Sequence, residues 1–280
     1  MAVANFIPEI WRAEVLVNFQ ARTVIANTVA REYEGDARTG NVVNVTEFER
    51  PSIVDYATGN DGGSRTIAPQ DLTATGQSIL IDQEKAFSFY VDDVDRRQAA
   101  GGMDVVTRDA SAGLAEDAES FLATTMQTSG TDSSPASELT TGNEAFDYVK
   151  GLRTTLSSDS VRAPLDGRTL LVNPEFAGLL LGADSKLTDV DTSGSPEGLR
   201  NATIGRLLGF NVVETPLLNP GTATCVAYHR SAVGFVSQLN ETEAIRAHNS
   251  FKDVVRGLHV YGGRVLRPEA CLVGVNPAAV

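Results

Sequence analysis

A glycine-rich stretch from Ser52 to Gly76 separates two segments in which apolar and polar residues alternate. Before it, Val43 and Val45 share one face of an expected strand. After it, the alternating apolar residues are Ile79, Ile81, Phe87, Phe89 and Val91. Two such strands predict a long hairpin with an open tip. A two-stranded hairpin is marginal alone, and loops beyond about 12 to 15 residues are usually functional or disordered. We therefore expect this element to lie on a neighbouring molecule.

The N-terminal segment predicts a helix that contacts several partners. Pro8 and Glu9 are typical of a helix start, because proline is preorganised for the first turn and a carboxylate there favours the helix dipole. Apolar residues follow on more than one side of this helix; they are Ile10, Ala13, Leu16, Val17, Phe19 and Val24. The polar run from Arg31 to Gly40 separates the helix from the strands.

After Gly101 and Gly102, a longer helix is predicted to run to about Gln127. Its apolar residues recur every three or four positions, and they are Met103, Val106, Ala110, Leu114, Ala118, Phe121 and Thr125. This stripe is expected to face the core. The acidic residues Glu116, Asp117 and Glu119 are expected to form a solvated face of the same helix.

Helices and strands mix in the second half, which indicates an α+β fold. The expected elements are a helix near 144–156, a strand at 169–172, a helix from Pro174 capped by Asn173, strands near 210–213 and 224–228, and a long strand at 254–265. Gly257, Gly262 and Gly263 in the last strand predict bulges or bends.

Composition places the chain among soluble globular proteins. Its 280 residues suffice for one large domain or two ordinary ones, and 42% hydrophobic with 21% charged residues is near the globular average. No apolar stretch approaches the ~20 residues that cross a bilayer, and residues 1–11 lack the pattern of a signal peptide. We therefore expect a cytoplasmic product with no membrane partner.

The formal net charge of −13 argues against a protein that reads DNA. Binding to phosphates requires clustered lysine and arginine. The acidic balance is compatible with a container whose inner wall must not adhere to enclosed DNA. Cys225 and Cys271 form no CxxC pair, so we expect buried, reduced thiols and neither a disulfide framework nor a zinc site.

The sequence carries no recognisable catalytic motif: G-x-S-x-G, G-x-x-x-x-G-K-[ST] and G-x-G-x-x-G are all absent. The histidines lack the spacing of a helical metal pair; they are His229, His248 and His259. Asp92, Asp93 and Asp95 form the densest carboxylate cluster, for which capping of a helix at 92–98 is favoured over metal binding. We therefore assign no catalytic, cofactor-binding or metal-binding residue and expect no enzyme.

Five segments carry a family resemblance: FIPEIW at 6–11, SFYVDDVDRRQA at 88–99, TLLVNPEFAGLL at 169–180, IGRLLGFNVVETPLL at 204–218 and FKDVVRGLHVYGGRVLRPEA at 251–270. In this order they resemble the major capsid proteins of tailed bacteriophages with the Hong Kong phage type capsid fold, which encapsulin shells share. The resemblance covers nearly the whole chain.

The resemblance implies an α+β fold in four parts. Residues 1–40 would be an N-terminal arm lying on a neighbour, 41–91 an extended β-hairpin loop, 92–142 and 241–280 a peripheral domain with a long spine helix, and 143–240 an axial domain. It implies a structural protein that self-assembles through pentamers and hexamers into an icosahedral shell around double-stranded DNA, without sequence-specific DNA binding or a cofactor. Further implied partners are a portal protein, a separate scaffolding protein and a decoration protein. The implied location is the virion, after assembly in the host cytoplasm.

Two alternatives remain open. An encapsulin-like compartment has the same fold but houses an enzyme cargo, and neighbouring genes would distinguish it. An acidic α+β enzyme would show a pocket with converging polar groups and perturbed acids.

Some family members join neighbouring subunits by an isopeptide bond between a loop lysine and an asparagine. The lysines of this chain are Lys85, Lys150, Lys186 and Lys252, of which only Lys85 lies in the loop segment, well past the tip. Arg65 at the tip offers no amine lone pair. A shell held by non-covalent contacts is therefore predicted.

Overall fold

The computed structural model describes residues 24–35, 40–48, 51–53, 69–71, 74–92, 104–182, 184, 205–219, 221, 223–247 and 251–277. Helices and strands are both present, which confirms the expected α+β class. The helices are η2 (Ile25–Asn27), η3 (Glu32–Gly35), α2 (Asp104–Ser129), α3 (Gly142–Ser157), α4 (Pro174–Leu180), η4 (Arg230–Ala232) and η5 (Pro268–Ala270), where η marks a 3-10 helix. The strands are β1 (Val42–Phe48), β2 (Ala74–Leu80), β3 (Gln83–Asp92), β4 (Thr131–Asp132), β5 (Arg168–Val172), β6 (Arg206–Leu207), β7 (Phe210–Glu214), β8 (Cys225–His229), β9 (Val233–Arg246), β10 (Lys252–Val265) and β11 (Cys271–Gly274).

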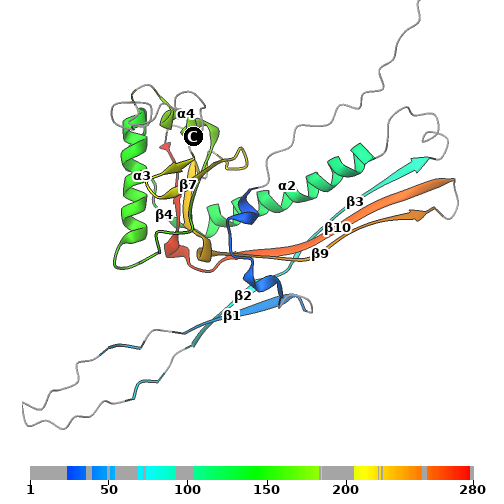
Figure 1. Cartoon of the computed structure of the whole chain (residues 1–280), viewed down its shortest axis with the longest axis horizontal. Coiled ribbons are helices and arrows are strands. Elements are labelled where there is room, and N and C mark those ends of the chain that lie inside the picture. Colours follow the sequence, from blue (N-terminus) through cyan, green and yellow to red (C-terminus); the bar gives the residue numbers. More distant parts are fainter. Residues whose placement is uncertain are drawn as a thin grey trace, which may run out of the picture.

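The molecule is elongated. Figure 1 shows a body with α3 and α4 at one end, the long helix α2 running beside β3, β10 and β9, and the β1–β2 hairpin extending away from both. Three separate sheets produce this arrangement: β1-β2, β3-β10-β9 and β4-β11-β8-β5-β7-β6. Within the described residues, no helix is long and apolar enough to cross a membrane.

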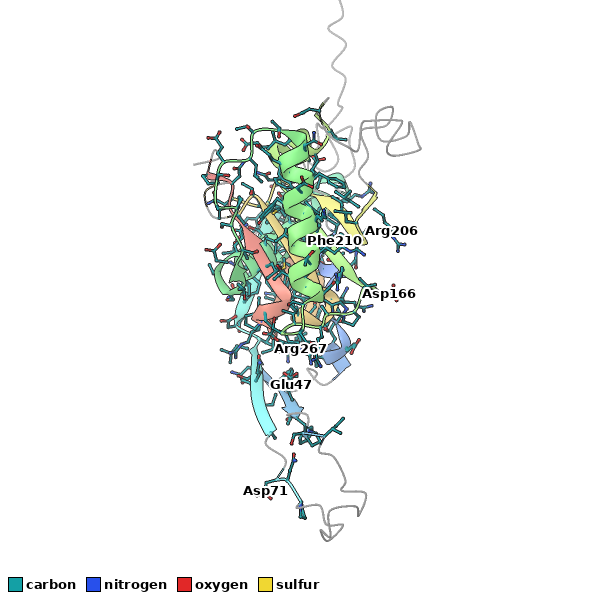
Figure 2. The ribbon with its side chains drawn as sticks, turned by 90° about the vertical axis from the view of Figure 1, so that its left-hand side faces the viewer. Glu47, Asp71, Asp166, Arg206, Phe210 and Arg267 are labelled. Atoms are coloured by element: carbon teal, nitrogen blue, oxygen red, sulfur yellow. The ribbon has the colours of Figure 1, made fainter. Side chains whose placement is uncertain are left out.

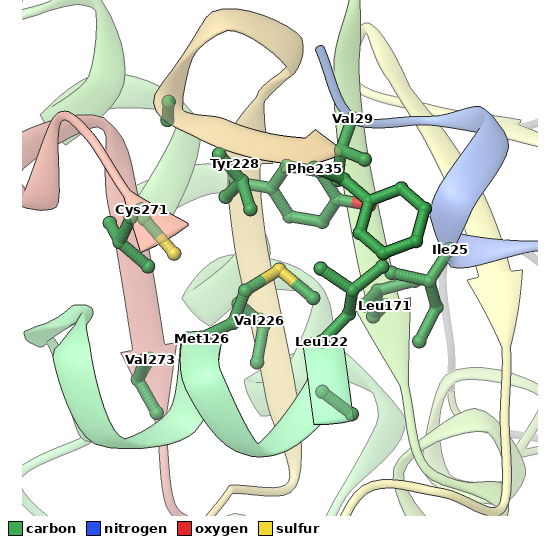
Figure 3. Packing of buried hydrophobic residues seen from close by; sticks show 14 of the residues in the cluster. Ile25, Val29, Leu122, Met126, Leu171, Val226, Tyr228, Phe235, Cys271 and Val273 are labelled. Carbon is green, nitrogen blue, oxygen red and sulfur yellow. The ribbon is translucent and has the colours of Figure 1, made fainter. Parts of the chain in front are cut away.

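The six-stranded sheet forms the core of the body because it is covered on both faces. Its strands β5 and β11 are buried along their whole length, as expected for a sheet between two helical layers. Successive side chains point to opposite faces. Leu170 and Val172 therefore pack with α3 and α4, whereas Leu171 packs with α2. Figure 3 shows the α2 side, where Leu122 and Met126 lie in the cluster with Leu171.

The helices α3 and α4 begin where their sequences supply capping groups. The Thr141 side chain accepts a hydrogen bond from the Glu144 amide, and the Glu144 carboxylate accepts one from the Thr141 amide, which makes a capping box. Asn173 caps α4 by accepting from the Phe176 amide at 2.8 Å, with Pro174 next to it in the first turn. The expected cap at Asn173 is thus confirmed.

The long helix α2 is confirmed, but its buried side is broader than the expected stripe and is centred beside it. Leu122, Ala123 and Met126 are fully buried, whereas Phe121 is only partly buried. Of the expected stripe, Ala118 is buried, Leu114 and Thr125 are partly buried, and the side chains of residues 103 and 106 lie outside the described residues. The helix contacts two sheets, so its apolar side is broader than one stripe, and an error of one residue turns a helix face by about 100°.

Helix α2 packs against one face of the three-stranded sheet. Its central strand β10 pairs antiparallel with β3 and with β9. The expected irregularity is present as a register shift between Val260 and Tyr261. Two glycines of β10 allow close approach of neighbouring groups. A Cβ at Gly257 would overlap the Phe87 ring, and one at Gly262 would overlap the Leu80 carbonyl oxygen.

The returning part of the expected hairpin is two strands and not one. β2 pairs with β1, with Val42 opposite Leu80, whereas β3 leaves this ribbon and joins β10. The break falls at Ile81 and Asp82. Alternation runs through both strands, so the sequence pattern showed no boundary. Most of the expected tip, residues 54–68, lies outside the described residues.

The packing of α2 generates a stability prediction. Leu122→Ala should lower the free energy of unfolding of the unassembled subunit by about 2 to 5 kcal/mol, because it removes fully buried methyl groups and leaves a cavity. Urea unfolding measures this change. Thr124→Ala, at an exposed position of the same helix, is the control and should stay within about 0.5 kcal/mol of the parent. Equal effects of the two substitutions would contradict the assigned buried face.

Candidate assembly surfaces

One carboxylate holds the segment that enters the body from the N-terminal side. Glu119 is 2% exposed, and its Oε2 accepts hydrogen bonds from the amides of Val24 at 3.0 Å and Ile25 at 2.6 Å. Its Oε1 accepts from the Ala26 amide at 2.8 Å. These amides open η2, and the first N–H groups of a helix have no partner within it. Carboxylate and amides satisfy one another, so the buried charge is compensated.

The expected solvated face of α2 is therefore wrong at Glu119. Asp117 is half-exposed but engaged, since its Oδ2 accepts from the Tyr261 hydroxyl at 2.6 Å and lies 3.8 Å from Lys85 Nζ. The missed signal was spacing, because Glu119 lies three and seven positions before the buried residues Leu122 and Met126. A carboxylate on a buried helix face indicates a specific partner.

The residues that follow the amides bound by Glu119 pack against the body of the same chain. Ile25 and Val29 are fully buried, and Thr28 Oγ1 hydrogen-bonds with the Tyr228 hydroxyl. Ala30 forms a parallel bridge to Gly234 of β9. The expected placement of an arm of residues 1–40 on a neighbour is therefore wrong for 24–35, because apolar content does not reveal which molecule buries it. Residues 1–23, including the helix expected from Pro8, lie outside the described residues.

Polar contacts fix the base of the β1–β2 hairpin to the body. Arg267 Nη2 donates to Glu47 Oε1 at 2.7 Å, and Figure 2 shows both residues at this base. Gln77 Nε2 donates to the Leu266 carbonyl at 2.8 Å, and Arg264 Nη1 to the Ser78 carbonyl at 2.9 Å. A hollow of about 380 Å³ lies beside the ion pair. Contacts to both strands hold the direction of the hairpin.

The outward face of the hairpin is uncharged and partly apolar. The register places Val42 opposite Leu80 and Phe48 opposite Ala74 on this face. The residues between them are Asn44, Thr46, Gly76 and Ser78. Val42 is 39% exposed, Leu80 53% and Phe48 66%. Within the described part of the chain nothing covers these side chains, so this ribbon face is a candidate docking surface.

The three-stranded sheet offers a second candidate surface on the side away from α2. Tyr90, Val254 and Ile245 stand in one row across its strands, and Tyr90 is 71% exposed. The next row holds Arg256, which forms an ion pair with Glu243. A hollow of about 400 Å³ lies over the Arg256 row and the row beyond it, which holds Leu258. This face combines apolar and charged positions, as the rim of a protein interface does.

The buried titratable groups are suited to structure and not to nucleophilic chemistry. Burial raises the pKa of Cys225 to about 12 and that of Cys271 to about 12, so both thiols stay protonated at neutral pH. Both cysteines are buried and free, as expected. Burial also raises the pKa of the Tyr228 hydroxyl and, with the nearby Asp117, that of Tyr261.

The histidines of the described residues have hydrogen-bond partners, as expected. His229 contacts the Asp166 carbonyl at 2.9 Å, and His259 contacts Ser237 Oγ at 3.0 Å. Burial lowers the pKa of both imidazoles, so they are neutral near pH 7. His248 lies outside the described residues.

The expected helix cap at the aspartate cluster is not found at its first member. Asp92 ends β3, and its Oδ2 lies 3.6 Å from Lys252 Nζ. Residues 93 and 95 lie outside the described residues. Across the described residues, no group of three histidine, cysteine or acidic side chains could hold a metal ion.

Comparisons with known proteins agree with this architecture. A profile of the family described as phage capsid protein matches residues 75–274. A solved structure from Mycobacterium phage Che8 is 41% identical with a TM-score of 0.85, and 98% of each chain is covered. The capsid structure of the cyanophage P-SCSP1u is 14% identical, with a TM-score of 0.74 over 99% of this chain and 95% of that one. The mature capsid of bacteriophage PhiM1 is 16% identical, with a TM-score of 0.73 over 98% and 95%. No functionally curated protein matches the chain.

The hydrogen bonds from three backbone amides to Glu119 generate a prediction about the N-terminal segment. Glu119→Ala leaves three amides without an acceptor, so it should destabilise the chain by about 3 kcal/mol and speed hydrogen exchange at Val24 to Ala26. Exchange measured by mass spectrometry tests this expectation. Glu116→Ala, one turn earlier and only partly buried, is the matched control. Unchanged exchange in Glu119→Ala would show that the carboxylate does not hold the segment.

Proposed function

Because the chain belongs to the phage capsid protein family, we propose that it assembles through pentamers and hexamers into the icosahedral shell of a tailed phage. Family membership makes it a structural protein of the virion capsid, with the Hong Kong phage type capsid fold expected from its sequence. The proposed contents are double-stranded DNA, bound without sequence specificity. The net charge of −13 supports such a wall, because clustered cations would hold the DNA to it.

The outward face of the β1–β2 hairpin is the observation that carries the assembly mechanism. An uncharged ribbon with exposed Phe48 and Leu80 gains burial when another subunit covers it. Its base is fixed by the Arg267–Glu47 ion pair, so little conformational freedom is lost on docking. Heterologous contacts of this kind close into rings, and rings with curvature close into shells.

We assign the parts of the chain to the parts of a capsid subunit. Residues 41–91 contain the extended loop, 92–142 and 241–280 the peripheral domain with α2 as its spine helix, and 143–240 the axial domain. β9 runs through the boundary at 240–241 and pairs with β10 along its length, so residues 233–240 share a sheet with the proposed peripheral domain. Residues 1–23 remain the candidate arm. A portal protein, a scaffolding protein and a decoration protein are the further proposed partners, and assembly is proposed in the host cytoplasm.

The alternatives are an encapsulin-like compartment that houses an enzyme cargo, and an acidic enzyme. The matching family profile and the relative at 41% identity both come from phages, which favours a phage shell over a compartment. Against an enzyme, the raised pKa values of Cys225 and Cys271 leave these thiols unreactive. Electron microscopy of the purified protein over a range of concentrations tests the proposal. Uniform shells, tubes or capsomer rings are expected, and compact monomers at every concentration would overturn it.

The ribbon face generates an assembly prediction. Phe48→Ser should reduce the yield of shells several-fold and leave the circular dichroism of the unassembled subunit unchanged, because Phe48 is 66% exposed within its own chain. Burying such a side chain contributes about 1.5 to 3 kcal/mol per contact. Asn44→Ser on the same ribbon face is the control. Sedimentation measures the yield, and wild-type yield from Phe48→Ser would contradict the docking role of this face.

The lysine positions generate a prediction about cross-links. Lys85, the lysine of the loop segment, lies on β3 with its Nζ 3.8 Å from Asp117 Oδ2 of its own chain. We expect mature particles boiled in detergent and reductant to run as one band near 29.7 kDa. A ladder of covalent oligomers would contradict a shell held by non-covalent contacts.

A further inference from the structure

The two edges of the six-stranded sheet carry opposite charges. The strand order places β4 at one edge and β6 at the other. Each edge strand has two residues, Thr131–Asp132 and Arg206–Leu207. Asp132 and Arg206 are both exposed. In Figure 2, Arg206 projects from one side of the body, with the red strand β11, the neighbour of β4, toward the other.

A rigid hairpin presents Arg206. Arg206 stands opposite Asn211 across a two-residue turn in which Leu208 and Gly209 both have positive φ, of 50° and 88°. Such a turn is tight and matches the strand twist. The Val212 amide donates to the Gly205 carbonyl at 3.1 Å, which extends the pairing. Within the described residues, the Arg206 guanidinium has no carboxylate partner.

Arg206 borders a hollow of about 530 Å³ that it shares with Arg230. Arg230 is also exposed and has no carboxylate partner in the described part of the chain. The lining contains one carboxylate side chain, Asp166, and Leu165 at 58% exposure. Arg168 lines the hollow too, but its guanidinium donates inward to carbonyl oxygens and to a serine hydroxyl. The hollow is therefore cationic with an exposed apolar side chain, which suits an acidic protein surface better than a bare phosphate.

The opposite edge presents carboxylates in a fixed geometry. Asp132 Oδ1 accepts from the Ser134 amide at 3.0 Å and the Ser134 hydroxyl at 2.6 Å, leaving Oδ2 available to a partner. These two hydrogen bonds lower the pKa of Asp132, so the group is ionised at neutral pH. The loop is held to β11 by the Ser133 amide, which donates to the Val273 carbonyl at 2.7 Å. Glu138 adds a second exposed carboxylate on the same loop.

A ring of identical subunits needs two different surfaces, on roughly opposite sides, that complement one another. Edge strands of two residues offer few backbone groups for pairing, so side chains decide the contact. We propose that Arg206 of one copy pairs with Asp132 of the next copy in the ring, which fixes the order and rotation of neighbouring subunits. Arg230 and Glu138 add a second complementary pair. This inference rests on the proposed self-assembly and names the contact that gives it direction.

Charge reversal tests the contact. Arg206→Glu and Asp132→Lys should each raise the lowest protein concentration that yields shells by about tenfold or more, because each places like charges together. The double variant restores opposite charges at every contact and should return to within about threefold of the wild type. Lys150→Glu is the control, since it reverses an exposed charge on α3 that belongs to neither edge strand, and it should assemble like the wild type.

Folding is checked by thermal unfolding of the unassembled subunits. If Asp132→Lys disturbs its loop, Asp132→Asn keeps an acceptor for Ser134 and removes only the charge, and should raise the assembly concentration less than the reversal does. The inference is overturned if the single reversals match Lys150→Glu or if the double variant is no better than both singles. If the wild type forms shells but the double variant does not rescue the single reversals, only the inference about Arg206 and Asp132 is overturned. If the wild type does not assemble at all, the proposed function is overturned.

Discussion

The packing of α2 between two sheets is the contact on which the rest of the structure depends. Leu122 and Met126 are buried in the cluster with the six-stranded sheet, and the Phe121 ring meets Tyr261 of β10 edge-on, with centroids 5.5 Å apart. A small sheet becomes stable through an apolar face shared by three or more strands or through packing against a helix, and α2 supplies such packing here. One helix therefore supports the long sheet, seals the body and holds the N-terminal segment through Glu119. Damage to it would affect folding before assembly.

Local signals predicted much of the body. Strand β5 ends in the apolar run 170–172, and Asn173-Pro174 combines a capping side chain with a residue preorganised for the first helical turn. Such features depend on neighbours in sequence, so a single chain reveals them. The capsid fold itself was recognised from five short segments together, because no single local pattern specifies how three sheets are arranged.

The rest depends on contacts between distant residues. Alternation is the same in β2 and β3, so nothing local shows that the chain leaves one sheet at Ile81 and enters another. Glu119 resembled a solvated acid because its three donors lie more than 90 residues away in sequence. The segment 24–35 looked like part of an arm because its apolar residues fit either its own body or a neighbour. Which residues contact one another across such distances is set by the tertiary fold and not by the local sequence.

The crossing of β10 under the hairpin has a mechanical consequence. Gly262 lies so close to the Leu80 carbonyl that a single methyl group there would force the two backbones apart. The hairpin extends from this point along the seven residues of β2, about 20 Å. A small change in the angle of the hairpin at this crossing therefore produces a larger displacement at the far end of its strands. One hydrogen atom in place of a side chain thus fixes the direction in which the ribbon leaves the body, and in the proposed shell this direction sets where a neighbouring subunit meets the ribbon.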